Sequence, residues 1–206
     1  MSAPPTTKLE VTAQEAAAIR TAVRTADLSL LSPAHRIAGP DHIAGLIALL
    51  ADPAVSDPIY DLPRPFTPDV IANWISEARE RQARGEAILA VTLDEQSKVS
   101  GYSYFTIWPE RSAAELAGAS RADVQGGGRG KAGAARSFGW MFEHLGVRLI
   151  GLTAAQDNVR SARVIEAAGF KAKGERQSVR LDGSVRISDY WELARDEWRA
   201  LLPGRD

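Results

Sequence analysis

A glycine-rich stretch carries the clearest chemical signal in the sequence. Four glycines lie within residues 126–130, and the apolar residues that follow have the i, i+3, i+4 spacing of a helix buried on one face. Glycine lets successive backbone N–H groups turn toward one point, with the positive end of the helix dipole behind them. Arg129 and Lys131 add positive charge at the same place. The stretch therefore predicts a phosphate or pyrophosphate site at a helix N-terminus.

Three glycine motifs compete for this stretch, and their spacing separates them. A Walker A loop needs glycine where Gln125 stands and Ser or Thr where Ala132 stands, so it fails at two positions. The dinucleotide fingerprint is matched by Gly128, Gly130 and Gly133, but the sequence before it is no buried strand and the next apolar run ends without an acidic residue. The third pattern, Q/R-x-x-G-x-G/A, is supplied by Gln125, Gly128 and Gly130.

A second motif lies downstream, within residues 157–170. It reads N-x-x-S-x-x-V/L-x-E-x-x-G-F, with Asn158, Ser161 and Glu166 at its polar positions. The two motifs, with a predicted strand between them, resemble the GNAT N-acetyltransferase superfamily, and the second resembles the branch that includes the ribosomal-protein N-terminal acetyltransferases. The resemblance implies transfer of the acetyl group of acetyl-CoA to a primary amine by direct attack. A chain without cysteine and without a G-x-S-x-G elbow agrees with a reaction that forms no acyl-enzyme.

The resemblance also implies which residues bind the co-substrate. The backbone of the glycine loop would hold the pyrophosphate of coenzyme A, and pantetheine would pair with the exposed backbone of a central strand that splays from its neighbour. For a lone asparagine such as Asn158, capping of its helix is the better explanation. The residues expected to bind acetyl-CoA are Val124, Gln125, Gly126, Gly127, Gly128, Arg129, Gly130, Lys131, Asn158 and Ser161.

Acetyl transfer needs a neutral amine, a polarised carbonyl and a proton for the leaving thiolate. By resemblance, Ser161 is the candidate acid or thiolate hydrogen-bond donor, although a serine in a first helical turn also bonds to backbone. Many relatives carry a tyrosine where this chain has Ile165, so that mechanism is absent at this position. Glu115, on the predicted central strand, is the candidate base, and a solvated strand-edge glutamate is an equally good explanation. Glu166, Asp189 and water are weaker alternatives.

Composition narrows the class of protein. The chain has 206 residues, 45% hydrophobic and 25% charged, which predicts a single globular domain. A net charge of −1 and a pI near 6.3 argue against a nucleic-acid partner. The histidines lack ligand spacing and there is no cysteine, so no metal site or disulfide is expected. The sequence shows no signal-peptide pattern and no apolar run of roughly 18 residues, so we expect a cytoplasmic protein without a membrane partner.

The candidate residues need strands and helices to position them. Residues 1–10 are polar with two prolines and predict a disordered tail. Residues 11–206 are expected to form one acetyltransferase domain, with an extra N-terminal helix at about 13–25 that begins at a capping box of Thr12 and Glu15. Further helices are expected after Asp41, after Thr67, after the glycine loop, from Asn158 and around Trp198. Apolar runs and alternation predict strands at 87–93, 99–108, 147–152, 170–180 and 185–193. The family resemblance implies a first strand within 28–38 and a central strand at 113–119.

The expected fold class is α+β (α/β): a GNAT fold with a central mixed, mostly antiparallel sheet, splayed at its central strands and flanked by helices. Asp182-Gly183 predicts a hairpin between the last two strands. Closely spaced prolines predict an irregular loop without a helix. The family resemblance implies that this loop walls the acceptor site, and a plain surface loop is an equally good explanation. These prolines are Pro53, Pro58, Pro63 and Pro65.

The sequence leaves the acceptor open between a protein N-terminal amine and a small amine such as an amino acid, polyamine or antibiotic. A rival interpretation is a catalytically inactive acyl-CoA-binding regulatory domain that keeps the glycine loop without turnover. A nucleotide-binding domain ranks third, and failure to bind acetyl-CoA would favour it. Dimers are common in the superfamily, so a homodimer is one option for the assembly.

Overall fold

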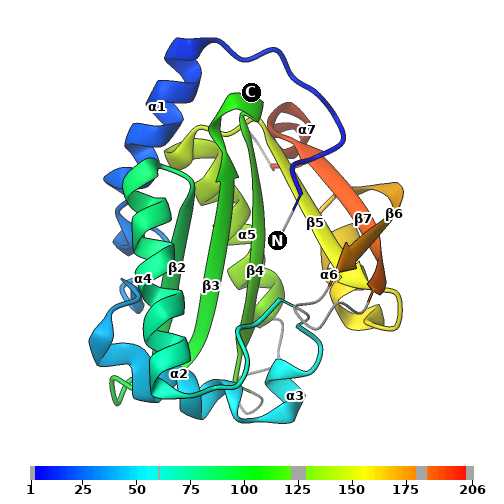
Figure 1. The fold of residues 1–206 in the computed structure, drawn as a ribbon. Coiled ribbons are helices and arrows are strands. Elements are labelled where there is room, and N and C mark those ends of the chain that lie inside the picture. The colour runs from blue at the N-terminus through cyan, green and yellow to red at the C-terminus, as the bar shows by residue number, and fades with distance from the viewer. Residues whose placement is uncertain (1–2, 60, 122–128, 180–184, 203–206) are drawn as a thin grey trace.

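A single open sheet organises the chain. The computed structural model describes residues 3–59, 61–121, 129–179 and 185–202, and in this part of the chain the strand order is β1-β2-β3-β4-β5-β7-β6 (Figure 1). Neighbouring described strands are antiparallel except β4 and β5, which are parallel. The strands are β1 (His35–Ile37), β2 (Ala87–Leu93), β3 (Val99–Trp108), β4 (Ala113–Ser120), β5 (Leu149–Ala155), β6 (Lys171–Val179) and β7 (Val185–Ala194).

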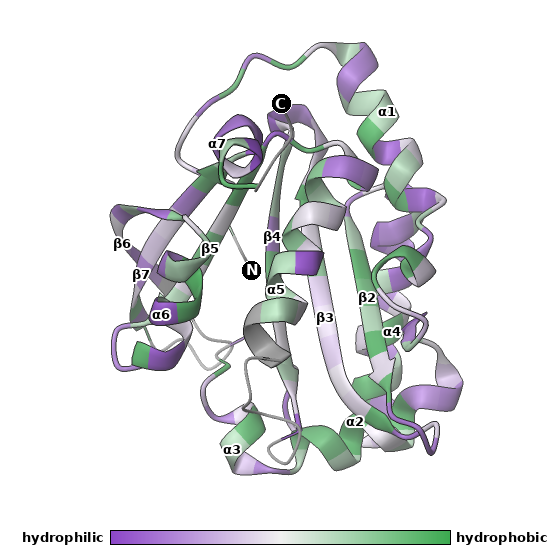
Figure 2. Cartoon of the chain, turned by 180° about the vertical axis from the view of Figure 1, so that it is seen from behind, coloured by the Kyte–Doolittle hydropathy of each residue, from purple (hydrophilic) through white to green (hydrophobic). Residues whose placement is uncertain are grey.

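Helices cover both faces of the sheet, which confirms the predicted fold class. Figure 1 shows α4 in front of the sheet and α5 behind it, and Figure 2 shows the same arrangement from the other side. Thr67 accepts a hydrogen bond from the Val70 N–H at 3.4 Å, so α4 begins where the sequence predicted. The helices are α1 (Ala13–Arg24), α2 (Ile43–Leu50), α3 (Pro53–Ser56), α4 (Pro68–Arg84), α5 (Arg129–Trp140, continued as a π-helical turn Met141–Leu145), α6 (Val159–Ala167) and α7 (Arg195–Ala200).

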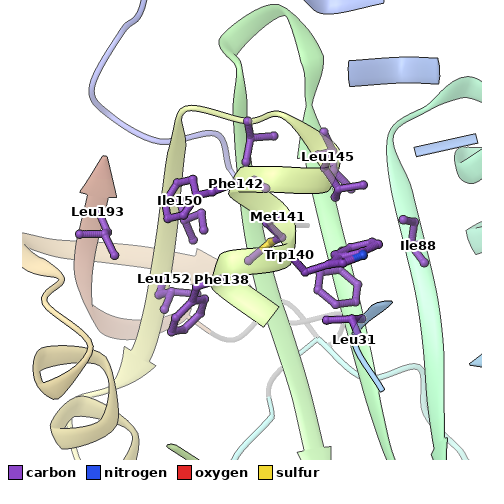
Figure 3. Close-up of a cluster of buried hydrophobic side chains, with 14 of the residues drawn as sticks. Leu31, Ile88, Phe138, Trp140, Met141, Phe142, Leu145, Ile150, Leu152 and Leu193 are labelled. Atoms are coloured by element: carbon purple, nitrogen blue, oxygen red, sulfur yellow. The ribbon is translucent and has the colours of Figure 1, made fainter. Parts of the chain in front are cut away.

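Each face of the sheet buries its own apolar core, because side chains alternate along a strand. On β2, Ile88 and Ala90 belong to the core under α5, whereas Leu89 and Val91 belong to the core under α4. We call these two sides the α5 face and the α4 face. Side chains of α5 and its π-helical turn, among them Phe138, Met141 and Leu145, fill the α5 face (Figure 3).

The first strand is shorter than the segment 28–38 that was expected to hold it. Asp27 accepts a hydrogen bond from the Ser29 N–H at 2.9 Å and starts a 3-10 turn over Leu28–Leu30. Extended backbone begins only at His35. A local side-chain cap therefore overrides the apolar pattern at the start of this segment.

The proline-rich segment contains a helix where the sequence predicted none. Pro53 occupies the first position of α3, where its missing N–H costs nothing, and Asp52 accepts from the Ala54 N–H at 2.9 Å. The helix ends at Ser56, before Pro58. The prolines therefore limit the length of a helix here without excluding it.

The last two strands pair as the hairpin signal predicted. β6 and β7 are antiparallel from Lys171 opposite Glu192 to Val179 opposite Val185. The predicted turn at Asp182-Gly183 lies outside the described residues.

Residues 3–10 differ from the predicted disordered tail. They lie against β5, β6 and β7, and we call them the N-terminal strap (Figure 1). Arg111 and Arg176 donate hydrogen bonds to four backbone carbonyls of the strap, and Glu192 accepts hydrogen bonds from its threonines. Each of these partners is at least 104 positions away in the sequence, so local composition gave no sign of them.

Candidate functional site

A fork opens between the two central strands. β4 and β5 pair over only three rungs, which end at Glu115 opposite Gly151. β4 then continues to Ser120 in pairing with β3, and β5 continues to Ala155 in pairing with β7. Residues 116–120 and 152–155 therefore have no partner strand across the fork among the described residues. Figure 1 shows the two strands close at one end and apart at the other, which confirms the predicted splay.

The glycine loop joins β4 to α5 along the chain. Five loop residues predicted to bind acetyl-CoA lie outside the described residues: Val124, Gln125, Gly126, Gly127 and Gly128. Arg129, Gly130 and Lys131 form the first turn of α5. The N-terminus of α5 therefore follows the wide end of the fork after eight intervening residues, 121–128. A helix start of this kind presents unpaired N–H groups and a positive dipole end.

Asn158 and Ser161 lie at the start of α6, which follows the wide end of β5. The Asn158 side chain accepts a hydrogen bond from the Ser161 N–H at 3.1 Å, so it caps the helix. Ser161 is half-buried in the first turn. Ile165 of the same helix packs into the core of the α5 face. The fold thus brings the starts of α5 and α6 to the same face and the same end of the fork.

Glu115 occupies the last rung before the strands separate. Its neighbours Ala114 and Leu116 pack into the α5-face core, so by alternation the carboxylate lies on the α4 face. Thr153 of β5 donates a hydrogen bond to Glu115 Oε1 at 3.4 Å. Glu115 and Ser161 therefore approach the fork from opposite faces.

The two weaker candidates for the base are placed less favourably. Glu166 is exposed on α6. Asp189 alternates with Tyr190 and shares its strand face with Trp191, which packs into the α5-face core. Neither carboxylate shares the α4 face with Glu115.

A buried carboxylate on β7 was not predicted from the sequence. Glu192 is only 2% exposed and accepts hydrogen bonds from the Tyr190 hydroxyl at 2.6 Å, the Thr6 hydroxyl at 2.9 Å, the Thr7 N–H at 3.1 Å and the Thr7 hydroxyl. Burial alone would raise the pKa of Glu192, but these hydrogen bonds outweigh it and lower the pKa to about 2. A charged residue between Trp191 and Leu193 in a predicted strand was the available sequence signal.

Asp61, in the proline-rich segment, is a second carboxylate on the α4 face. Burial raises the pKa of Asp61, and the nearby Arg186 of β7 opposes that rise. Asp61 also raises the pKa of Tyr102 and Tyr104, although burial is the larger cause for both, so its charge lies near the two tyrosines of β3. Arg186 donates a hydrogen bond to the Pro58 carbonyl at 2.8 Å, which ties the segment to β7.

Stacked aromatic side chains line the α4 face beside this segment. Trp74 of α4 stacks on Tyr104, with ring centroids 6.1 Å apart and planes inclined by 10°. Arg81 donates to the Tyr104 hydroxyl at 3.0 Å. Tyr102 is buried beneath Trp74, whereas Tyr104 is only half-buried. Tyr104 therefore belongs partly to the core and partly to the surface on the α4 face.

The described residues contain no group of three or more His, Asp or Glu side chains arranged to hold a metal ion. Among the helices of the same ranges, none combines the length and apolar character needed to cross a bilayer.

Comparison with known proteins supports the predicted GNAT fold. Residues 36–171 match the family model described as Acetyltransferase (GNAT) domain. The match includes β1 to β5, the glycine loop, α6 and the start of β6. A comparison with curated proteins gives no match.

Solved structures share the fold at low sequence identity. Ribosomal-protein-S5-alanine acetyltransferase from Vibrio fischeri is 18% identical, with a TM-score of 0.67 over 80% of this chain and 93% of that one. Mycobacterium smegmatis RimJ in complex with CoA-disulfide is 18% identical, with a TM-score of 0.69 over 82% and 83%. Spermidine N-acetyltransferase from Vibrio cholerae, in complex with CoA and spermine, is 16% identical, with a TM-score of 0.68 over 80% and 96%. Likeness at this level supports the fold and leaves the acceptor open.

The lowered pKa of Glu192 predicts how stability depends on pH. A carboxyl group whose pKa is depressed in the folded state stabilises the protein above its ordinary pKa of 4.5, and this contribution is lost as the pH falls toward 2. Glu192→Gln should therefore lower the free energy of unfolding at pH 6 by on the order of 2 kcal/mol. The difference from the unmodified chain should shrink as the pH falls below 4.5.

Urea unfolding between pH 6 and pH 3 measures this difference. The exposed Glu95→Gln is the matched control and should leave the curve within about 0.5 kcal/mol of the unmodified chain. A constant difference between Glu192→Gln and the unmodified chain across the range would contradict the assignment of a buried, charged carboxylate.

Proposed function

Because the chain belongs to the GNAT acetyltransferase family, we propose that it transfers the acetyl group of acetyl-CoA to a primary amine. The observation that carries the proposal is the fork between β4 and β5. Its open strand edges present alternating N–H and C=O groups, which complement the amide groups of a pantetheine arm. The start of α5 near the wide end supplies the N–H groups and dipole that suit a pyrophosphate. This set of donors fits coenzyme A.

The residues predicted to bind acetyl-CoA have distinct roles in this proposal. The backbone of residues 125–130 would hold the pyrophosphate, and Arg129 and Lys131 would add positive charge. Residues 116–120 would orient the pantetheine arm along β4. Bound acetyl-CoA supplies an activated thioester, so the chain itself needs no nucleophilic side chain. Ser161 would donate a hydrogen bond or proton to the departing sulfur, from a helix start that Asn158 holds in place.

The amine must reach the fork from the α4 face. Apolar side chains fill the α5 face behind β4 and β5, whereas Glu115 and Thr153 lie on the α4 face at the last rung. Glu115 is therefore proposed as the base that takes the proton of the amine. Asp61 is a second candidate, since a carboxyl group with a raised pKa is better matched to proton transfer near neutral pH.

The proposed acceptor is either a protein amine or a small-molecule amine. The related structures are of enzymes named for the alanine of a ribosomal protein and for spermidine, so they include both protein and small-molecule acceptors. A catalytically inactive acyl-CoA-binding domain is the alternative. It would bind acetyl-CoA equally well and release no thiol.

Binding and turnover are measured on the same sample. We expect calorimetry to show acetyl-CoA binding, and free thiol to appear when amines or N-terminal peptides are added. Gly128→Glu should abolish binding, because a carboxylate side chain would compete with the pyrophosphate for the loop backbone. Gly133→Ala is the matched control, since an added Cβ there meets no atom within 4 Å.

Full-affinity binding by Gly128→Glu would remove the role given to the glycine loop. Binding without thiol release from any acceptor would favour the inactive domain.

Substitutions of the two proposed catalytic side chains should change different kinetic parameters. Ser161→Ala should spare acetyl-CoA binding and lower kcat by about 10²-fold, because the thiolate loses its donor. Glu115→Gln should lower kcat/KM by a similar factor of about 10² and remove the acidic limb of its pH profile. Steady-state kinetics between pH 5 and pH 9 measure both effects. Unchanged kcat in the first variant, or an unchanged acidic limb in the second, would contradict the role of that residue.

A further inference from the structure

The N-terminal strap is held mainly through its backbone. Arg176 donates to the Ala3 carbonyl at 3.0 Å and to the Pro4 carbonyl at 2.9 Å. Arg111 donates to the Pro5 carbonyl at 2.8 Å and to the Thr7 carbonyl at 3.0 Å. Four of the five residues 3–7 thus offer a carbonyl to a fixed guanidinium. Contacts of this kind are available to any peptide that follows the same path.

Glu192 adds a second set of contacts that favours hydroxyl side chains. One of its oxygens accepts from the Thr6 hydroxyl and the Thr7 N–H, and the other accepts from the Thr7 hydroxyl. Lys173 Nζ lies 3.9 Å from Glu192 Oε2. A carboxylate that is 2% exposed needs such donors, because a buried charge without partners is costly. The strap therefore satisfies a charge that belongs to β7.

The strap runs along the α4 face of the sheet toward the fork. The Arg148 side chain, just before β5, donates to the Glu10 carbonyl at the closed end of the central strands. Pro5 lies further along, where its Cγ would be 3.2 Å from a Cβ built on Gly151, the partner of Glu115 in the last rung. Gly151 alternates with Ile150 and Leu152 of the α5-face core, so Pro5 lies on the α4 face. Figure 1 shows the strap in front of β5, on the same side of the sheet as α4.

The side chains under the strap form a connected polar site. The Arg176 guanidinium stacks 3.5 Å from the Tyr190 ring centroid, and the Tyr190 hydroxyl bonds to Glu192. Ser188 lies two positions before Tyr190 and so on the same face of β7. It is fully buried, and its Oγ has no hydrogen-bond partner among the described residues. The strap therefore rests on charged and hydrogen-bonding side chains of β6 and β7. A strap that served only to cover apolar surface would not need this arrangement.

We propose that this face of β5, β6 and β7, together with Arg111, is a binding site for an irregular or extended peptide with hydroxyl side chains, and that residues 3–7 occupy it in competition with a peptide acceptor. Arg111 and Arg176 bind the peptide carbonyls, and Glu192 binds the N–H and hydroxyl donors. The identification of the competing peptide as an acyl acceptor rests on the proposed function. The peptide site itself does not.

Direct binding tests the site without any turnover. The probe is the peptide of residues 2–7, acetylated at its N-terminus and carrying a fluorophore at its C-terminus, so that it has no free amine. Fluorescence anisotropy should show binding to a chain that lacks residues 2–7. The full chain should bind at least about tenfold more weakly, because its own strap leaves only a small fraction of sites open.

Variants separate the site from non-specific binding. Replacing both threonines of the probe by valine should weaken binding to the shortened chain by about tenfold or more, because Glu192 then loses two hydroxyl donors and keeps its charge buried. Glu192→Gln in the shortened chain should weaken binding of the original probe, whereas Glu95→Gln should not. Equal affinity for the two probes, or equal binding by the full and shortened chains, would overturn the proposal.

A second variant covers the case in which the shortened chain does not fold. Thr6→Val with Thr7→Val in the full chain loosens the strap without removing it. This double variant should bind the probe more tightly than the unmodified chain. Binding no tighter than that of the unmodified chain would overturn the proposal and leave the strap as a structural element.

Kinetics distinguish a failure of this inference from a failure of the proposed function. The shortened chain should show a lower KM for a peptide acceptor and an unchanged KM for acetyl-CoA, and the capped peptide should inhibit competitively against the acceptor. Probe binding without thiol release from any amine would contradict the proposed function and support the peptide site. Thiol release without probe binding or inhibition would contradict the peptide site and support the proposed function.

Discussion

The three-rung pairing of β4 and β5 is the constraint on which the rest of the site depends. Two parallel strands that stay paired would satisfy each other's backbone and leave no room for a ligand. Here the pairing stops at Glu115 and Gly151, while β3 and β7 hold the outer edges of the two strands. The sheet therefore stays continuous at one end and opens at the other. The open edges give a ligand with amide groups a place to bind.

The two faces of the sheet suit different parts of the proposed reaction. On the α5 face, a filled apolar core fixes α5 and α6, and both helices start near the wide end of the fork. That side suits a phosphorylated ligand. The α4 face carries Glu115, the half-buried Asp61 and the buried Glu192, and the strap and the proline-rich segment cover it. That side suits a group that approaches the fork and gives up a proton.

Much of this arrangement follows from local patterns in the sequence. Apolar runs and alternation indicated β2, β3, β5, β6 and β7, and the family resemblance indicated β4. Thr67 and Asn158 marked the helix starts that they cap. The fork was expected only through the family resemblance, because no property of Glu115 or Gly151 alone says where pairing ends. The acetyl-CoA-binding roles of loop residues 124–128 stay predictions.

The strap and its partners could not be predicted in the same way. Arg111, Arg176 and Glu192 come from three separate strands or turns and meet residues 3–7 only after the sheet has formed. A polar, proline-containing terminus has the composition of a disordered tail, and only tertiary contacts override that expectation. The same holds for Asp61, whose burial depends on a segment that packs against β3 and β7. Long-range polar contacts leave no periodic trace in a sequence.

Hydrogen exchange at the fork would test the central claim most directly. Backbone amides of residues 116–120 that point into the fork should exchange quickly in the free protein and slow markedly with saturating coenzyme A. Amides of β2, which is paired on both sides, should not change. Slowed exchange at 116–120 alongside an unchanged β2 is the result that the fork assignment predicts. Coenzyme A that binds and leaves the exchange of 116–120 unaltered would show that the ligand lies elsewhere, and would contradict the account.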